Sequence, residues 1–161
     1  MDISSDRDRV SLQPLAASYS DASTFRAFKP PVVLVVDDDA DNLQLACYIV
    51  EQAGYVALSA GSGKDALVQV QEHEVHLVLL DIVLPDMDGF QVIKQLQQRF
   101  SGQLMPVVAL TALATESERL QMIDAGFSSF LCKPYAIDDL EAILGQYCPL
   151  SGLASLQTVA R

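Results

Sequence analysis

Short apolar runs alternate along the chain with longer stretches in which apolar residues recur every three or four positions. The runs are rich in Val and Leu and are continuous rather than alternating, which is typical of strands buried on both faces of a sheet. They lie at residues 32–36, 55–59, 77–80, within 105–113, and at 128–132. Five strands separated by helices of crossover length predict a doubly wound α/β fold with a five-stranded parallel sheet.

Helical periodicity fills the gaps between these runs. After the first strand, Leu43, Ala46, Val50 and Ala53 form one apolar stripe, and Gly54 is expected to end the helix. The other predicted helices have the apolar positions Ala66, Leu67 and Val70, then Ile93, Leu96 and Phe100, then Leu120 and Ile123, and finally Leu140, Ile143 and Leu144.

Polar residues mark the starts of several of these helices. Asp39, Asp41 and Asp88 lie where apolar stripes begin, so we predict that they cap helices rather than bind a ligand. Thr115 and Glu118 have the spacing of a capping box, in which each side chain accepts a hydrogen bond from the backbone of the other residue. The fourth helix is therefore expected to begin at this point.

The chain has 161 residues, enough for one core of ordinary size. Residues 1–30 show no apolar period, so we expect a flexible N-terminal extension, then one domain at 31–147 and a C-terminal tail at 148–161. No apolar run approaches the roughly 20 residues of a membrane helix, and a signal pattern is absent, so we expect a cytoplasmic protein without a membrane partner. Three widely spaced cysteines without a CxxC pair indicate neither a disulfide framework nor a zinc site.

The net charge of −11 is concentrated in the predicted domain. Residues 1–30 carry four acidic and four basic side chains, whereas residues 31–161 carry 17 acidic and six basic ones. This distribution argues against direct binding of nucleic acid or an anionic membrane, because both need a basic patch. A metal ion or a basic partner surface fits the charge better.

If the strands run in parallel, the residues at their carboxyl ends meet along one edge of the sheet. Asp37 and Asp38 follow the first strand and Asp81 follows the third, while Thr111 ends the fourth and Lys133 follows the fifth. Three neighbouring carboxylates repel one another unless a cation lies between them. All-oxygen ligation without His or Cys indicates Mg²⁺, with Mn²⁺ also suitable.

A lysine and a hydroxyl beside such an ion complete a site for a phosphoryl group. The ion and Lys133 oppose the charge on the phosphoryl oxygens, and Thr111 donates a hydrogen bond. Asp81 would then be the nucleophile that forms an aspartyl phosphate. The sequence thus favours phosphoryl transfer to the protein itself.

Four motifs carry a resemblance to a known family. They are VVDD at 35–38, LLDIVLPDMDG at 79–89, ALTA at 109–112 and FLCKP at 130–134. In this order and spacing the chain resembles the receiver domain of two-component response regulators, especially stand-alone, chemotaxis-regulator-like members. The resemblance implies a flavodoxin-like (βα)5 receiver fold. It also implies a single-domain phosphorelay protein that is not an enzyme, although it supports its own phosphorylation and slow autodephosphorylation.

The resemblance assigns the metal site and the phosphoryl donor. Asp81 would accept the phosphoryl group from a sensor histidine kinase or a histidine phosphotransfer protein. Asp38, Asp81 and the backbone carbonyl of Val83 would ligate Mg²⁺ directly, and Asp37 would assist through water. The Lys133–Pro134 bond resembles the cis peptide of the family.

The resemblance also assigns a switch. Thr111 and Lys133 would contact the phosphoryl group, and movement of Thr111 would let the aromatic ring of Phe130 turn inward. This change would remodel the face made by the fourth helix, fifth strand and fifth helix, where a downstream protein partner would bind. No Arg-rich pattern follows Leu140, as it does in the charge-paired dimers of DNA-binding regulators, so we expect a monomer or a weak homodimer.

Two positions near the site are apolar where fast-dephosphorylating members of the family often have polar groups. Val83 lies two residues after Asp81, and Leu113 lies two residues after Thr111. Polar side chains at these positions often orient the water that hydrolyses the aspartyl phosphate. The resemblance therefore implies a long-lived phosphorylated form.

Two alternatives remain open at this point. Asp37, Asp39, Thr111, Lys133 and residues 138–139 loosely follow the motif order of haloacid-dehalogenase-like phosphatases, which would make Asp37 the nucleophile. The chain is short for that fold, and the alternative does not explain the motif at 79–89. The other alternative is an interaction module of the same fold that works without phosphorylation.

Overall fold

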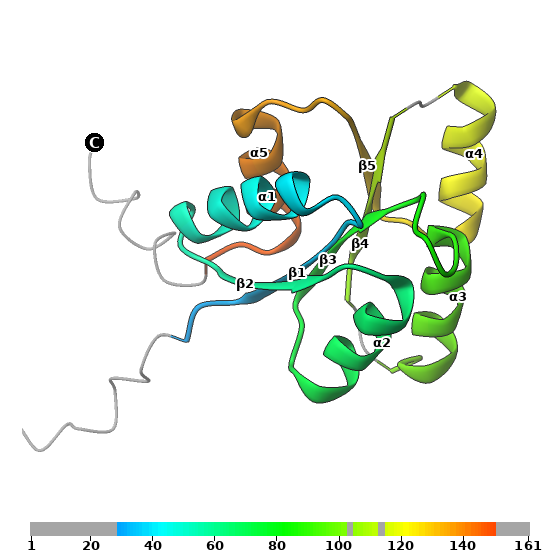
Figure 1. Cartoon of the computed structure of the whole chain (residues 1–161), viewed down its shortest axis with the longest axis horizontal. Coiled ribbons are helices and arrows are strands. Elements are labelled where there is room, and N and C mark those ends of the chain that lie inside the picture. Colours follow the sequence, from blue (N-terminus) through cyan, green and yellow to red (C-terminus); the bar gives the residue numbers. More distant parts are fainter. Residues whose placement is uncertain (1–28, 103–104, 113–114, 151–161) are drawn as a thin grey trace, which may run out of the picture.

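The computed structural model of the chain describes residues 29–102, 105–112 and 115–150. Within these residues five strands alternate with five helices (Figure 1). The strands are β1 (Val32–Val36), β2 (Val56–Ala60), β3 (Leu77–Asp81), β4 (Val107–Thr111) and β5 (Ser129–Cys132). The helices are α1 (Ala40–Gln52), α2 (Gly63–Glu72), α3 (Gly89–Arg99), α4 (Glu116–Ala125) and α5 (Ile137–Tyr147). None of these described helices is long and apolar enough to cross a membrane.

All five strands run in parallel, in the order β2-β1-β3-β4-β5. Helices α1 and α5 cover one face of the sheet, and α2, α3 and α4 cover the other (Figure 1). The predicted doubly wound five-stranded parallel sheet is therefore confirmed. The strand order reverses between β1 and β3, and open sheets of this kind place their ligands at the carboxyl ends of the strands at such a point.

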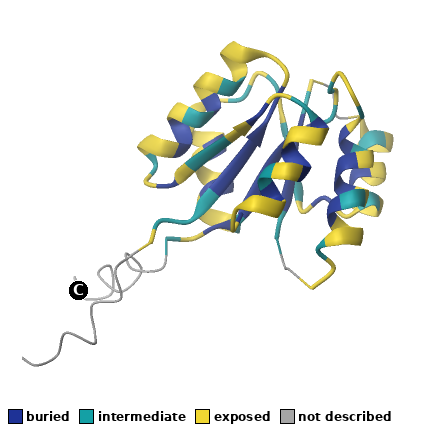
Figure 2. Cartoon of the chain, turned by 60° about the horizontal axis from the view of Figure 1, so that its bottom comes forward, coloured by how far each residue is buried: buried dark blue, intermediate teal, exposed yellow. Residues whose placement is uncertain are grey.

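Two apolar layers hold the helices on the sheet. Residues 33–36 of β1 and residues 77–80 of β3 have no exposed area, because successive side chains of a strand point to opposite faces and both faces are covered. The buried centre is dark blue in Figure 2. The positions just beyond these strands are thus attached to the fully buried centre of the sheet.

Most of the predicted helix starts agree with the structure. Asp39 caps α1, and Asp88 and Thr115 form capping boxes at the starts of α3 and α4. The prediction that Asp41 is a cap was wrong. It lies inside the first turn of α1, where its own N–H donates to the Asp39 side chain at 3.0 Å, since the helix begins one residue before it.

Helix α4 differs from its expected packing. Leu120 and Ile123, the apolar positions that the periodicity singled out, are 57% and 64% exposed, and Met122 is the buried residue of the helix. The helix contacts α3 and β5 through another side, because it lies near the β5 edge of the sheet (Figure 1). Two large apolar side chains are left on its surface.

The predicted terminal segments lie mostly outside the described residues, which begin at 29 and end at 150. Among the described residues of the predicted tail, Cys148 is buried and Leu150 packs against the layer under α1 and α5. The domain boundaries at 31 and 147 stay predictions.

Candidate functional site

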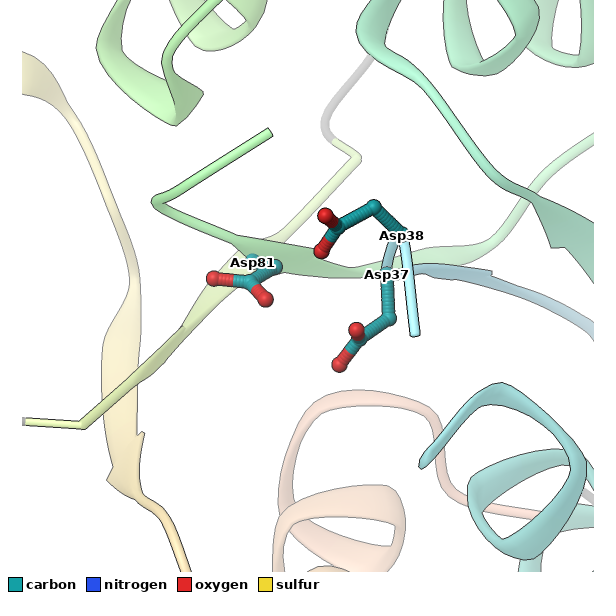
Figure 3. Close-up of side chains that lie close together, drawn as sticks. All are labelled: Asp37, Asp38 and Asp81. Carbon is teal, nitrogen blue, oxygen red and sulfur yellow. The ribbon is translucent and has the colours of Figure 1, made fainter. Parts of the chain in front are cut away.

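Three aspartates meet at the carboxyl edge of the sheet, where β1 and β3 end (Figure 3). Asp37 and Asp38 follow β1 directly, and Asp81 is the last residue of β3. Because β1 and β3 are neighbouring parallel strands, their ends fall side by side. One carboxylate oxygen of each aspartate lies within 4.8 Å of those of the other two.

The three carboxylates differ in exposure. Asp37 and Asp81 are only 2% and 8% exposed, whereas Asp38 is exposed. Oδ1 of Asp37 accepts a hydrogen bond from the N–H of Asp39 at 2.9 Å, and Oδ1 of Asp81 accepts one from the N–H of Val83 at 2.9 Å. These backbone contacts hold the two buried carboxylates and leave one oxygen of each for other partners.

Lys133 supplies positive charge to the cluster. Its backbone N–H donates to the carbonyl of Thr111 at 2.7 Å, and its Nζ donates to Oδ2 of Asp37 at 2.5 Å and to Oδ2 of Asp81 at 2.8 Å. Burial, the largest single influence, lowers the pKa of Lys133, but the hydrogen bonds and charges of the two aspartates together raise it above its usual value of 10.5. Lys133 is therefore protonated at neutral pH.

The predicted switch residues lie on the two strands next to this cluster. Thr111 is the half-buried last residue of β4 and is in register with Cys132 of β5. Phe130 of β5 is half-buried and packs against the apolar layer under α2, α3 and α4. The guanidinium carbon of Arg119, on α4, lies 5.0 Å from the centre of the Phe130 ring. The predicted residue Leu113 lies outside the described residues.

The donor set of the cluster fits a hard divalent cation. The ammonium group of Lys133 contacts Asp37 and Asp81, and its single charge compensates only part of the negative charge of the three carboxylates. The side-chain ligands are all oxygens, which Mg²⁺ and Mn²⁺ prefer. The N–H of Val83 donates to Asp81, so the main chain of this loop lies against the cluster.

A surface cavity of about 280 Å³ opens beside this cluster. It is lined by Asn42 and Leu45 of α1 and by Lys133, Pro134 and Tyr135 of the loop between β5 and α5. Leu45 is 54% exposed at its edge. Lys133 is therefore open to solvent on the α1 side.

One contact near the site escapes sequence reasoning. Oδ1 of Asp86, in the loop between β3 and α3, accepts the N–H of Gly63 at 2.8 Å, and Oδ2 accepts the N–H of Lys64 at 2.9 Å. These two hydrogen bonds, that of Gly63 first, lower the pKa of Asp86 below its usual value of 3.8. The partners lie 23 and 22 residues earlier in the chain, so no local spacing could reveal the contact.

An open parallel sheet with the strand order β2-β1-β3-β4-β5 defines the flavodoxin-like class of α/β domains. The carboxylates and the lysine lie at the switch point of this sheet, where domains of the class bind their ligands. Within that class, residues 33–145 match the family model of the response regulator receiver domain. This range covers more than half of the chain and all four motifs. The chain therefore belongs to the receiver-domain family of two-component response regulators, as its motifs predict.

Individual curated proteins are similar to this chain over most of its length. A 14.6 kDa protein encoded in the 3′ region of sodA1 in Leptolyngbya boryana is 36% identical over 118 residues, which make up 72% of this chain and 88% of that protein. The signal transduction histidine-protein kinase BarA of Escherichia coli is 33% identical over 123 residues, which make up 76% of this chain and 13% of the kinase. This chain thus corresponds to one segment of that much longer protein.

Solved structures share the fold. The chemotaxis protein CheY4 of Vibrio cholerae superimposes with a TM-score of 0.70 at 24% identity, over 74% of this chain and 99% of that one. The receiver-domain match includes Asp81 and the motif at 79–89, which a haloacid-dehalogenase-like phosphatase leaves unexplained. We therefore do not retain that alternative.

Proposed function

We propose that the protein accepts a phosphoryl group on Asp81 in a Mg²⁺-dependent reaction and signals through a protein partner. The observation that carries the proposal is the position of the Asp81 carboxylate. Its Oδ2 lies 2.8 Å from the Lys133 ammonium, and one of its oxygens lies within 4.8 Å of oxygens of Asp37 and Asp38. Phosphoryl transfer needs mainly positioning and charge neutralisation, and this arrangement provides both.

The reaction forms one bond and breaks another. A carboxylate oxygen of Asp81 attacks the phosphorus of a phosphohistidine on a sensor kinase or phosphotransfer protein. The P–N bond breaks, and its electron pair goes to the imidazole nitrogen of the donor. Lys133 and the hydroxyl of Thr111 donate hydrogen bonds to the phosphoryl oxygens, so Lys133 exchanges its contact with Asp81 for one with the phosphoryl group.

The acidic cluster would hold the metal. Asp38, Asp81 and the carbonyl of Val83 would ligate Mg²⁺ or Mn²⁺, with Asp37 assisting through water. The bound cation supplies positive charge against the phosphoryl oxygens. Buried Asp37 also keeps Lys133 protonated and directed into the cluster, because its Oδ2 accepts from Lys133 Nζ.

The output would pass through the face made by α4, β5 and α5. Thr111 would move toward the phosphoryl group, and Phe130 would turn inward beneath α4. Exposed Leu120 and Ile123 on α4 support this proposal, because adjacent exposed apolar side chains favour protein binding. The substitutions Leu120→Ser and Ile123→Ser should weaken a partner that prefers the phosphorylated protein, and equal affinity would contradict this role.

Intact-mass analysis after incubation with acetyl phosphate tests the phosphoacceptor. We expect wild type to gain one phosphoryl mass with Mg²⁺ and none without it, while acetate is released. Asp81→Asn should abolish the gain. Asp88→Asn is the matched control, because it changes an aspartate at the end of the loop that follows Asp81 while Asn still caps α3.

A second outcome would favour the remaining alternative. If wild type gains no mass from acetyl phosphate or from a promiscuous histidine kinase, the proposal fails. An interaction module that works without phosphorylation would then explain the fold better. A gain that persists in Asp81→Asn would instead place the phosphoryl group on another residue.

A further inference from the structure

The loop between β3 and α3, residues 82–88, is tied to the rest of the protein at two points. The first lies where the loop returns to β3. The N–H of Gly89 donates to the carbonyl of Ile82 at 2.8 Å. A Cβ at Gly89 would lie 2.9 Å from Ile82 Cα and 3.0 Å from the Asp81 carbonyl oxygen, so only glycine permits this approach.

Asp86 makes the second tie, to the start of α2. Its carboxylate accepts the N–H groups of Gly63 and Lys64, the first two residues of the helix. The N–H of the third residue, Asp65, already donates to the side chain of Ser62, the local cap. Asp86 therefore accepts the first two N–H groups of α2 and Ser62 accepts the third, groups that have no acceptor within the helix.

Asp86 itself is exposed, but its neighbour Met87 packs closely against the start of α2. A Cβ at Gly63 would lie 2.4 Å from Cγ of Met87 and 2.8 Å from Cγ2 of Val92, so the loop presses directly on the first residue of α2. Nε2 of Gln95 lies 3.6 Å from Sδ of Met87. Residues 86 and 87 are thus fixed between α2 and α3.

Val83 lies between these two ties and has little packing of its own, since it is 75% exposed. Its N–H donates to Asp81, and its carbonyl is the backbone ligand in the proposed metal site. We infer that Asp86 is a positioning residue for this site, because its contact with the start of α2 holds the loop that carries Val83 in place. This inference rests on the proposed Mg²⁺ site.

Two substitutions that each remove contacts to the start of α2 distinguish positioning of the loop from simple stabilisation of the helix. Asp86→Ala removes two hydrogen bonds to α2 and releases the loop. Ser62→Ala removes the local cap of α2 and leaves the loop attached. Asp86→Asn keeps an acceptor oxygen but no charge, so it should behave between wild type and Asp86→Ala.

Calorimetric titration of the full chain with Mg²⁺ at constant ionic strength is the main measurement. We expect Asp86→Ala to bind Mg²⁺ about fivefold more weakly, somewhat less than the effect of groups that hydrogen-bond a ligand directly. Ser62→Ala should bind like wild type, although both variants lower the unfolding midpoint. Equal Mg²⁺ affinity in wild type and Asp86→Ala, or equal weakening in Asp86→Ala and Ser62→Ala, overturns the inference.

Hydrogen exchange without metal keeps the two proposals distinguishable. In Asp86→Ala the Val83 amide should exchange faster than in wild type, and in Ser62→Ala it should not. If wild type shows no Mg²⁺ binding that depends on Asp81, the proposed metal site fails and the role of Asp86 in it fails with it. Unchanged Val83 exchange in Asp86→Ala, with normal Mg²⁺ binding by wild type, overturns the inference about Asp86 alone.

Discussion

The two ends of the carboxyl edge of the sheet are built differently. At the β1 and β3 end, Asp37 and Asp81 are buried, accept backbone hydrogen bonds and share Lys133. At the β4 and β5 end, Thr111 and, further back along β5, Phe130 are only half-buried, and the helix beside them buries Met122 alone. The proposed reacting groups thus lie in a buried, hydrogen-bonded setting, whereas the proposed responding groups lie in a more exposed part of the molecule.

This difference has a physical meaning. A reaction that depends on positioning needs groups that do not move, and hydrogen bonds to strand ends provide that. A segment that must change conformation is drawn from the less stable parts of a structure, where few apolar contacts are buried. Substitutions at the β1 and β3 end should therefore change mainly the rate of phosphorylation. Those at the β4 and β5 end should change mainly the stability and the response.

The largest effect is expected at the β1 and β3 end of the sheet edge, where Lys133 contacts the two buried aspartates. Lys133→Met keeps the aliphatic stem of the side chain but removes the charge that Asp37 and Asp81 share. We expect phosphorylation by acetyl phosphate to slow about 100-fold, as for the loss of one preorganised donor to a developing negative charge. Rates from intact-mass time courses check this. Lys64→Met, an exposed lysine of α2, is the control and should react like wild type.

Alkaline pH should weaken the contact of Lys133 with Asp37 and Asp81. The pKa of Lys133 is raised in the folded protein, so the stability it contributes is complete below 10.5 and is lost as the pH rises through its folded value. The stability difference between wild type and Lys133→Met should therefore shrink above pH 10.5. Denaturant midpoints of both proteins across that range measure the difference. A constant difference would show that the contact does not depend on the lysine charge.

At the β4 and β5 end, stability should depend on Met122, the buried residue of α4. Met122→Ala should lower the unfolding free energy by about 2–3 kcal/mol, because Met122 is only 3% exposed and its truncation to alanine leaves a cavity. Leu120→Ala should change stability by less than about 0.5 kcal/mol, since the side chain is largely in solvent. Urea unfolding of both variants checks the contrast, and similar losses would contradict this packing of α4.

The same contrast explains how much the sequence could predict. Continuous apolar runs identified all five strands because the central ones are buried on both faces, and the parallel order then placed Asp37, Asp38 and Asp81 together. Periodicity could not decide which stripe of α4 faces the core, because apolar residues lie on both sides of the helix. Asp86 was missed because its partners are brought to it only by the packing of α2 against the loop.

A smaller effect is expected at Val83, the exposed loop position beside Asp81. Val83→Asn places a polar group beside Asp81 at a 75% exposed position, so the fold should tolerate it. We expect the phosphorylated form to decay several times faster, because an amide can orient the attacking water. Decay of the phosphoryl mass after removal of acetyl phosphate measures this.

Val68→Asn, at a 46% exposed position of α2, is the control for that substitution and should leave the decay unchanged. If wild type itself loses its phosphoryl group within seconds, the prediction of a long-lived phosphorylated form is wrong. Equal decay of wild type and Val83→Asn would show that position 83 does not limit hydrolysis.

The smallest effect is expected at the contact between Arg119 and Phe130. A guanidinium over an aromatic ring at the surface stabilises by about 0.5–1 kcal/mol, so Arg119→Gln should lower the unfolding free energy by about that amount. In a Phe130→Leu background the same substitution should have almost no effect, since the ring is gone. Urea unfolding of the four proteins of this double-mutant cycle gives the coupling energy.

Phosphorylation should change this coupling energy if Phe130 turns inward. The contact joins α4 to β5 in the unphosphorylated protein, so moving the ring away from Arg119 would remove it from the folded state. We expect the coupling to fall toward zero when the cycle is repeated with acetyl phosphate and Mg²⁺. An unchanged coupling in fully phosphorylated protein would show that Phe130 keeps its place, and the response would then have to travel through Thr111 and the start of α4 instead.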